Sequence, residues 1–196
     1  MQLETLKNNL IRRGFATKIY ETKESLKKDI ESIIQNKSVG FGGSMTLKNL
    51  GILDIINQNA KKVFPHITGE CGENERSALT ADIFFLSANA ISLEGEIVNI
   101  DGTGNRIAAT CFGPQKVIYI IGKNKITKNL ESALERAKIA AVKVAKRLDR
   151  KTPCTKTGKC EDCLSPGCVC SVTTIHRKRP HGVNMDVLIL NEECGI

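Results

Sequence analysis

The sequence predicts an α/β domain of the Rossmann-like class, with a mostly parallel sheet flanked by helices. Short apolar runs with strand character alternate with longer stretches of helical periodicity, a pattern typical of parallel sheets. The 196 residues, 41% of them hydrophobic, suffice for one domain with a real core, residues 1–196. About residues 152–170, rich in cysteine and poor in large apolar side chains, we expect a small metal-ordered lobe inserted near the C-terminus.

The first part of the chain is expected to begin with amphipathic helices. Leucine and isoleucine recur at helical spacing over residues 3–11 and again over residues 26–34, where Thr22 is a suitable N-cap. Residues 38–41 are short and extended, and they lead through glycines into a helical stripe over residues 47–56. We therefore expect a strand, a glycine loop and a helix in succession.

Most of the predicted strands follow. They are four apolar or β-branched runs at residues 63–67, 82–87, 96–100 and 117–121. A long helix is then predicted from Thr127, with an apolar stripe that ends at Leu148. Two last runs, at residues 172–175 and 187–190, are expected to return the chain to the sheet after the lobe.

The composition favours a cytoplasmic protein without a membrane partner. The first residues mix basic and apolar side chains at helical spacing, unlike a secretory signal. No apolar run reaches the roughly 18 residues that are needed to span a bilayer. Five of the eight cysteines fall within the 17 residues from Cys154 to Cys170, so metal binding is favoured over disulfides.

The net charge of +8 is concentrated in one segment. Residues 123–151 hold ten lysines and arginines against three acidic residues, a net charge of +7. A solvated basic helix face is the simplest interpretation. The absence of tryptophan and the presence of only two tyrosines disfavour a nucleic-acid partner, because few side chains are left to stack on bases. A zinc-stabilised nucleic-acid binder is kept as an alternative.

The cysteine segment has the spacing C-x5-C-x2-C-x4-C-x-C. Its CxxC turn allows Cys160 and Cys163 to face one ion or one cluster edge, and Cys154 supplies a third thiolate. We expect Cys170 as the fourth ligand, with Cys168 as the alternative. Four thiolates serve both a [4Fe-4S] cluster and zinc. The single CxxC turn favours the cluster, while structural zinc and a redox thiol set are the alternatives.

Two glycine loops predict a pocket for a small anionic ligand. The first stands where a strand gives way to a helix and offers Gly42, Gly43, Ser44 and Thr46. The second offers Gly102, Gly104, Asn105 and Arg106. The Arg106 guanidinium is suited to a bidentate contact with an oxyanion. A simple tight turn is the alternative for each loop.

Carboxylates stand at the ends of the predicted strands. They are Asp82, Glu94, Glu96 and Asp101. Open α/β sheets bind ligands at strand ends, where a carboxylate can act as a base or nucleophile. An ordinary surface charge is the alternative for each of them.

Three segments carry a resemblance to a known family. They are residues 42–47, residues 87–106 and residues 153–163. Together they resemble the LUD-domain family, the lactate-utilisation proteins of the LutC/YkgG type. The family's fold is similar to that of ribose-phosphate isomerase, glucosamine-phosphate deaminase and the CoA transferases. In those isomerases a loop similar to residues 39–46 binds phosphate.

The resemblance implies a role in oxidising lactate to pyruvate, within an oxidoreductase complex that has iron-sulfur partner subunits. It does not define a reaction for this domain, and it leaves self-association into a homo-oligomer open. Carried over, it places Ser44 and Thr46 against the ligand. Asp82 and Glu94 take the places of catalytic carboxylates, and Asn99, Asp101 and Arg106 line the mouth of the site.

One departure from the related isomerases bears on the reaction. Residues 82–106 contain no lysine to match the one beside the isomerase carboxylates, which argues against sugar-phosphate isomerisation. The first hypothesis for the function is an iron-sulfur subunit of lactate oxidation. The alternative is an enzyme of the phosphosugar or acyl-CoA type with a structural zinc site.

Overall fold

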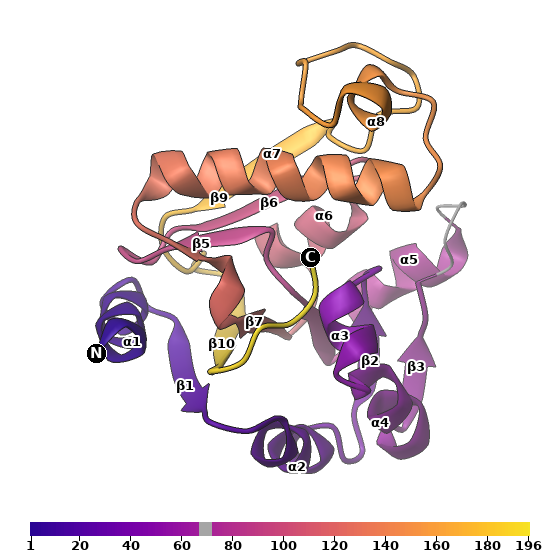
Figure 1. Cartoon of the computed structure of the whole chain (residues 1–196). Coiled ribbons are helices and arrows are strands. Elements are labelled where there is room, and N and C mark those ends of the chain that lie inside the picture. The colour runs from indigo at the N-terminus through magenta and orange to yellow at the C-terminus, as the bar shows by residue number, and fades with distance from the viewer. Residues whose placement is uncertain (67–71) are drawn as a thin grey trace.

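The computed structural model describes residues 1–66 and 72–196, and its centre is a six-stranded parallel sheet (Figure 1). Ile67 and Cys71 lie outside the described residues. The strands follow the order β1-β10-β7-β4-β2-β3. Their bounds are β1 Ala16–Tyr20, β2 Ser38–Phe41, β3 Lys62–Phe64, β4 Ile83–Leu86, β7 Lys116–Gly122 and β10 Asn184–Leu190. The predicted fold class is confirmed.

A second, smaller sheet lies beside the first. Its strand order is β8-β5-β6-β9, with bounds β5 Ala90–Ser92, β6 Ile97–Asp101, β8 Ile126–Thr127 and β9 Val172–His176. β6 pairs antiparallel with both β5 and β9. The sequence did not predict this sheet, because β5 and β8 are too short to show a period.

The helices and the second sheet cover the main sheet on opposite faces. Helices α2 (Lys23–Ile33), α3 (Met45–Asn49) and α4 (Ile52–Asn59) bury their apolar residues on one face, against Ile118 and Ile120 of β7. Alternate residues of β7, Val117 and Tyr119, point to the other face. There they meet α1 (Gln2–Arg12), α6 (Asn105–Cys111) and the inner side of the second sheet.

Helix α7 (Leu130–Arg147) forms an outer layer across the second sheet (Figure 1). Its inward face is made of small side chains, including Ala133, Ala137 and Ala141, which pack on Ala90 and Val98 of the strands beneath. Small residues on both sides allow a close approach of helix and sheet. The contact therefore fixes the position of the helix tightly.

The cysteine-rich segment leaves the end of α7 as a separate lobe (Figure 1). A short helix within it, α8 (Pro153–Thr157), packs beside α7 and ends at Gly158, which has a positive φ of 80°. The chain then returns through β9 to the second sheet and through β10 to the main sheet. The lobe thus stands where the sequence predicted it, although only β10 of the two returning strands joins the main sheet.

Local signals explain where the other helices begin and end. Thr22 caps α2 as expected, because its Oγ1 accepts a hydrogen bond from the N–H of Ser25 at 3.3 Å. The predicted helix over residues 47–56 is divided into α3 and α4 at Gly51, whose φ of 67° lies in the left-handed region. The long helix begins after Asn129, whose side chain accepts a hydrogen bond from the N–H of Ser132, and not at Thr127.

A further short helix, α5 (Glu73–Ser77), precedes β4. No helix in the described part of the chain is long and apolar enough to cross a membrane.

The alanine face of α7 yields a stability prediction. Ala137→Leu adds three carbons to a fully buried contact, so we expect the free energy of unfolding to fall by about 1–3 kcal/mol. Lys143→Leu places the same side chain on the exposed face of α7 and should change stability by less than about 0.5 kcal/mol. Urea unfolding followed by circular dichroism measures both. Equal stability of the two variants would contradict the close packing of this helix.

Candidate functional site

The carboxyl ends of the central strands meet at one edge of the main sheet. The first glycine loop follows β2, Ser87 follows β4, and the turn η2 (Lys123–Lys125) follows β7. In parallel sheets this edge is the usual place for ligands. Ser44 caps α3, because its Oγ accepts a hydrogen bond from the N–H of Leu47 at 3.3 Å. Thr46 lies buried in the first turn of that helix.

Lys125 brings a buried amine to this edge. Its side-chain Nζ donates hydrogen bonds to Thr46 Oγ1 at 2.7 Å and to Ser87 Oγ at 2.8 Å, and the residue is only 3% exposed. Within the described residues no carboxylate forms an ion pair with it. The sequence pattern indicates a solvated basic face here and does not predict that Lys125 is buried. Its place three residues after a buried strand was the available signal.

Burial lowers the pKa of Lys125 to about 8, from 10.5. Burial is the largest cause of this shift, and the neighbouring guanidinium groups of Arg136 and Arg106 contribute to it, while the thiol of Cys194 acts in the opposite direction. Removing an ammonium group from water disfavours its charged form. A lysine with this pKa is partly neutral near pH 8 and can act as a base or nucleophile.

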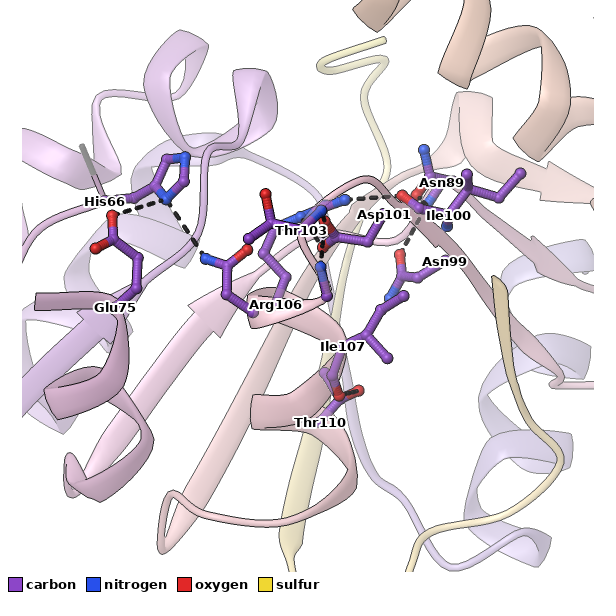
Figure 2. Close-up of polar contacts among 12 residues, drawn as sticks. His66, Glu75, Asn89, Asn99, Ile100, Asp101, Thr103, Arg106, Ile107 and Thr110 are labelled. Atoms are coloured by element: carbon purple, nitrogen blue, oxygen red, sulfur yellow. Dashed lines mark hydrogen bonds and ion pairs between the residues drawn. The ribbon is translucent and has the colours of Figure 1, made fainter. Parts of the chain in front are cut away.

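Asp101 and Arg106 organise the second glycine loop (Figure 2). Arg106 Nε donates to Asp101 Oδ2 at 2.9 Å, and its Nη2 donates to the carbonyl of Ile100 at 2.9 Å. The other carboxylate oxygen of Asp101 accepts hydrogen bonds from the N–H groups of Thr103 and Gly104. Asp101 therefore holds the loop and the arginine in place and is poorly suited to act as a base.

Two glycines join these loops to each other and to the lobe. A Cβ added to Gly42 would overlap Cγ and Cδ of Arg106, whose stem lies directly against the first loop. A Cβ added to Gly102 would lie 2.9 Å from Cα of Val169, in the cysteine-rich segment. Both glycines are needed because the neighbouring chain approaches so closely, and not because of an unusual φ.

His66 and Glu75 stand on the other side of the second loop (Figure 2). His66 Nδ1 lies 3.4 Å from Glu75 Oε1 and 3.5 Å from Asn105 Nδ2. Burial is the main cause that lowers the pKa of His66, and Arg106 lowers it as well. The carboxylate of Glu75, which acts in the opposite direction, does not outweigh them. This histidine is therefore mostly neutral at pH 7 and can exchange a proton with a ligand.

Three neighbouring cavities lie along this edge beneath α7. A small one of about 50 Å³ is lined by Lys125, Thr46 and Ser87. A central one of about 280 Å³ is lined by the second glycine loop, His66 and the end of α7. A third, small and largely apolar, lies under the lobe. The first two share Gly43 and Arg106 among their walls, so they adjoin.

Arginines of α7 and the segment after it face the central cavity. Arg147 lines both the central cavity and the Lys125 cavity, and Arg150 lines the central one. Within the described residues, the Arg147 side chain forms no ion pair with a carboxylate. Arg136, by contrast, donates hydrogen bonds to the carbonyls of Asn124 and Asn89 and so ties α7 to the sheet edge. The cavities consequently carry an excess of positive charge.

The cavity under the lobe collects the clustered cysteines. Cys154, Cys160, Cys163, Cys168 and Cys170 all contribute to its walls. The remaining wall is mainly apolar and comes from β6 and α7, including Ile100, Ala141 and Val142. Five thiols fit a four-thiolate site with one to spare, and an apolar surround suits a sulfur-ligated cluster. No group of three Cys, His, Asp or Glu side chains in the described residues is already gathered as around a single ion.

Several of the predicted site residues lie away from these cavities. Asp82 precedes β4 at the opposite edge of the main sheet, where its Oδ2 accepts hydrogen bonds from Ser38 N–H and Ser38 Oγ. These bonds are the main cause that lowers the Asp82 pKa. Glu94 lies in the turn between β5 and β6, next to Arg13 of the segment after α1. Neither carboxylate adjoins the glycine loops, so their position gives no support to a catalytic role.

Asn99 is buried between the two sheets. Its Oδ1 accepts from the N–H of Asn89 at 3.0 Å (Figure 2). Its Nδ2 donates to Tyr119 Oη at 3.3 Å. Asn99 therefore does not line a cavity, and its side chain instead joins Asn89, which lines the central cavity, to Tyr119 of the main sheet. Gly42 and Gly104 shape the two glycine loops but do not line a cavity. The remaining residues predicted for ligand or metal binding all line at least one of the three cavities. Those residues are Gly43, Ser44, Thr46, Asp101, Gly102, Asn105, Arg106 and the five clustered cysteines.

The contact between the two glycine loops can be tested by mutation. Gly42→Ala forces the Arg106 stem away and weakens its ion pair with Asp101, so we expect a loss of about 1–3 kcal/mol in the free energy of unfolding. Gly182→Ala is the matched control, because a Cβ there meets only the Phe112 ring at 3.8 Å. Chemical unfolding compares the two variants. A Gly42→Ala protein as stable as the control would show that Arg106 does not depend on this contact.

Comparisons with known proteins agree with this architecture. The family model of the LUD domain matches residues 3–190. Among solved structures, the chain is similar to a DUF162 family protein from Deinococcus radiodurans, with a TM-score of 0.54 and 13% sequence identity over 97% of this chain and 96% of that one. At that identity the similarity supports the fold alone. A comparison with curated proteins gives no significant match. Because the family model covers nearly its whole length, the chain belongs to the LUD domain family.

Proposed function

We propose that this domain is an iron-sulfur subunit or accessory protein of lactate oxidation, with a pocket for a small anionic ligand at the strand ends. LUD-domain proteins are associated with lactate utilisation, and the chain belongs to this family. The observation that carries the proposal is the common wall of two cavities. Ile100, Ala141, Cys168 and Val169 line both the central cavity and the cavity that collects the cysteines. A ligand in the first would therefore lie one layer of side chains from a group held in the second.

Charge supports a carboxylate as the ligand. Lys125, Arg106, Arg147 and Arg150 line the central cavity or the Lys125 cavity. Two carboxylates also line the central cavity, but Asp101 is engaged by Arg106 and Glu75 lies against His66. Arginine binds carboxylates through paired N–H groups. Lactate and pyruvate each carry one carboxylate beside a hydroxyl or a carbonyl, groups that Ser87, Thr46 and His66 can meet by hydrogen bonding.

The thiol cavity supplies the proposed cofactor site. A [4Fe-4S] cluster held there would take up and release single electrons, which the side chains of this domain cannot do themselves. The protein's own contribution is the ligand set, the apolar wall and Lys138, which adjoins the cavity and pairs with Asp162 at 3.0 Å. Partner subunits would then exchange these electrons, so oxidation of the hydroxy acid is assigned to the complex and not to this domain alone.

Lys125 also bears on the alternative function, an enzyme of the phosphosugar or acyl-CoA type with structural zinc. A lysine does reach the site, although from beyond residues 82–106. The two carboxylates expected beside it, Asp82 and Glu94, nevertheless lie elsewhere. The alternative consequently lacks the two catalytic carboxylates predicted for it, and the iron-sulfur subunit is the better supported of the two.

Metal analysis tests the cofactor. We expect anaerobically purified protein to contain iron and acid-labile sulfide in equal amounts, with visible absorption that reduction bleaches. Cys163→Ser should lose both elements, whereas Cys111→Ser, an exposed cysteine on α6, should keep them. If Cys170 is the fourth ligand, Cys168→Ser retains the cluster and Cys170→Ser loses it. One zinc per chain without sulfide would contradict the cluster and favour the structural zinc site.

Ligand binding tests the pocket. Lactate or pyruvate should raise the unfolding temperature, because a ligand that binds only the native state stabilises it, by about 2.7 kcal/mol at a hundredfold excess over its Kd. Arg147→Gln should reduce the shift severalfold by removing a cation shared by two cavities. Arg12→Gln, on the surface of α1, should leave it unchanged. The absence of a shift with either acid would contradict the proposal. So would a shift of the same size in the wild type and in Arg147→Gln.

A further inference from the structure

We propose that Lys125 is a covalent attachment site for a small 2-oxo acid, in which the amine adds to the ligand's carbonyl carbon and forms an imine. The inference rests on the proposed function, because it takes a 2-oxo acid, the product class of hydroxy-acid oxidation, as the ligand. It goes further by naming the reacting atom and the bond.

The hydrogen bonds of Lys125 suit a neutral amine. A neutral amine has two N–H groups and one lone pair, whereas an ammonium group has three N–H groups and none. Two acceptors surround Nζ, the hydroxyls of Thr46 and Ser87, at 2.7 and 2.8 Å. Within the described residues no third acceptor bonds to it. Both N–H groups of the neutral form are therefore satisfied, and the lone pair is left for an incoming electrophile.

The charges around Lys125 act in the same direction. Arg136 of α7 and Arg106 of α6 are the cations that influence it, and Cys194 near the end of the chain is the titratable group of opposite effect. Together with burial they bring its pKa to about 8. Near that pH about half of the molecules carry the nucleophilic neutral form at equilibrium.

Cavity size and charge indicate the class of ligand. The cavity beside Lys125 measures about 50 Å³. The space directly beside Nζ is therefore small, and a longer ligand would have to extend into the adjoining central cavity. Arg106 and Arg147, which line this cavity and the central one, provide the cations for a carboxylate. A short acid with a carbonyl next to its carboxylate meets both conditions.

The bond changes balance without an oxidant or reductant. The lone pair of Nζ forms a bond to the carbonyl carbon, and the carbonyl π pair moves to the oxygen, which takes a proton. The nitrogen gives up both of its protons as the C–N double bond forms, a second proton reaches the hydroxyl oxygen, and the C–O bond breaks to release water. Thr46 and Ser87, each within hydrogen-bond distance of Nζ, are placed to carry these protons. The products are one imine and one water molecule.

Borohydride trapping tests the proposal. The full-length protein is incubated with pyruvate, sodium borohydride reduces any imine to a stable secondary amine, and peptide mass spectrometry locates the adduct. We expect one adduct on Lys125, with a yield that rises severalfold between pH 7 and pH 8.5 as the neutral amine becomes more abundant. Lys123→Met, an exposed lysine of the same turn, should leave the adduct unchanged. An adduct spread over surface lysines, or its absence, overturns the proposal.

Two variants and a second acid separate this inference from the proposed function. Lys125→Met removes the amine, and Lys125→Arg keeps a cation that cannot form an imine. Both should lose the adduct, and circular dichroism confirms that they are folded. Lactate has no carbonyl, so it should stabilise the wild type without modifying it. Stabilisation by both acids without an adduct overturns the covalent step alone, whereas no stabilisation and no adduct overturns both proposals.

Discussion

The contact of α7 with the second sheet is the constraint on which the candidate site depends. Ala133, Ala137 and Ala141 meet small side chains of β5 and β6, so the helix axis lies close to the strands. From this position Arg136 reaches the carbonyls of Asn124 and Asn89, and the last turn of the helix reaches the central cavity. A larger side chain at the contact would lift the helix and open the cavities together, since α7 forms part of the wall of each.

The close approach also explains the unusual electrostatics. Arg106, Arg136 and Lys125 come from three different elements, and only Arg106 has a carboxylate partner within the described residues. Uncompensated positive charge in a partly buried site is costly unless an anion or a loss of protons relieves it. The structure provides for both, through cavities that open beside these groups and through the lowered pKa of Lys125. The electrostatic cost of this uncompensated positive charge thus favours both the binding of an anion and the neutral, reactive form of the amine.

Much of the fold follows from local sequence signals, and the site follows only in part. The apolar runs at residues 83–86 and 117–121 could not be solvated, so they identify central strands. Thr22 predicts the start of α2 through its own hydrogen bond. The second sheet escaped prediction because β8 has only two residues. Asp82 stands before β4, at the amino end of the strand, whereas the glycine loops lie at the carboxyl ends, so a carboxylate next to an apolar run did not by itself indicate a place in the site. Lys125 looks like any surface lysine until distant elements enclose it.

The lobe and the central cavity cannot behave independently. Gly102 of the second glycine loop lies against Val169, and Cys168 lines both the central cavity and the cavity of the clustered thiols. Few apolar side chains order the lobe, so a cluster held by its thiols, as proposed above, would fix its conformation. A group that orders the lobe therefore also sets the wall against which a ligand packs. Linked binding equilibria are reciprocal, so in the proposed arrangement a ligand in the cavity would change the affinity of the thiols for the cluster by the same factor as the cluster changes the affinity for the ligand.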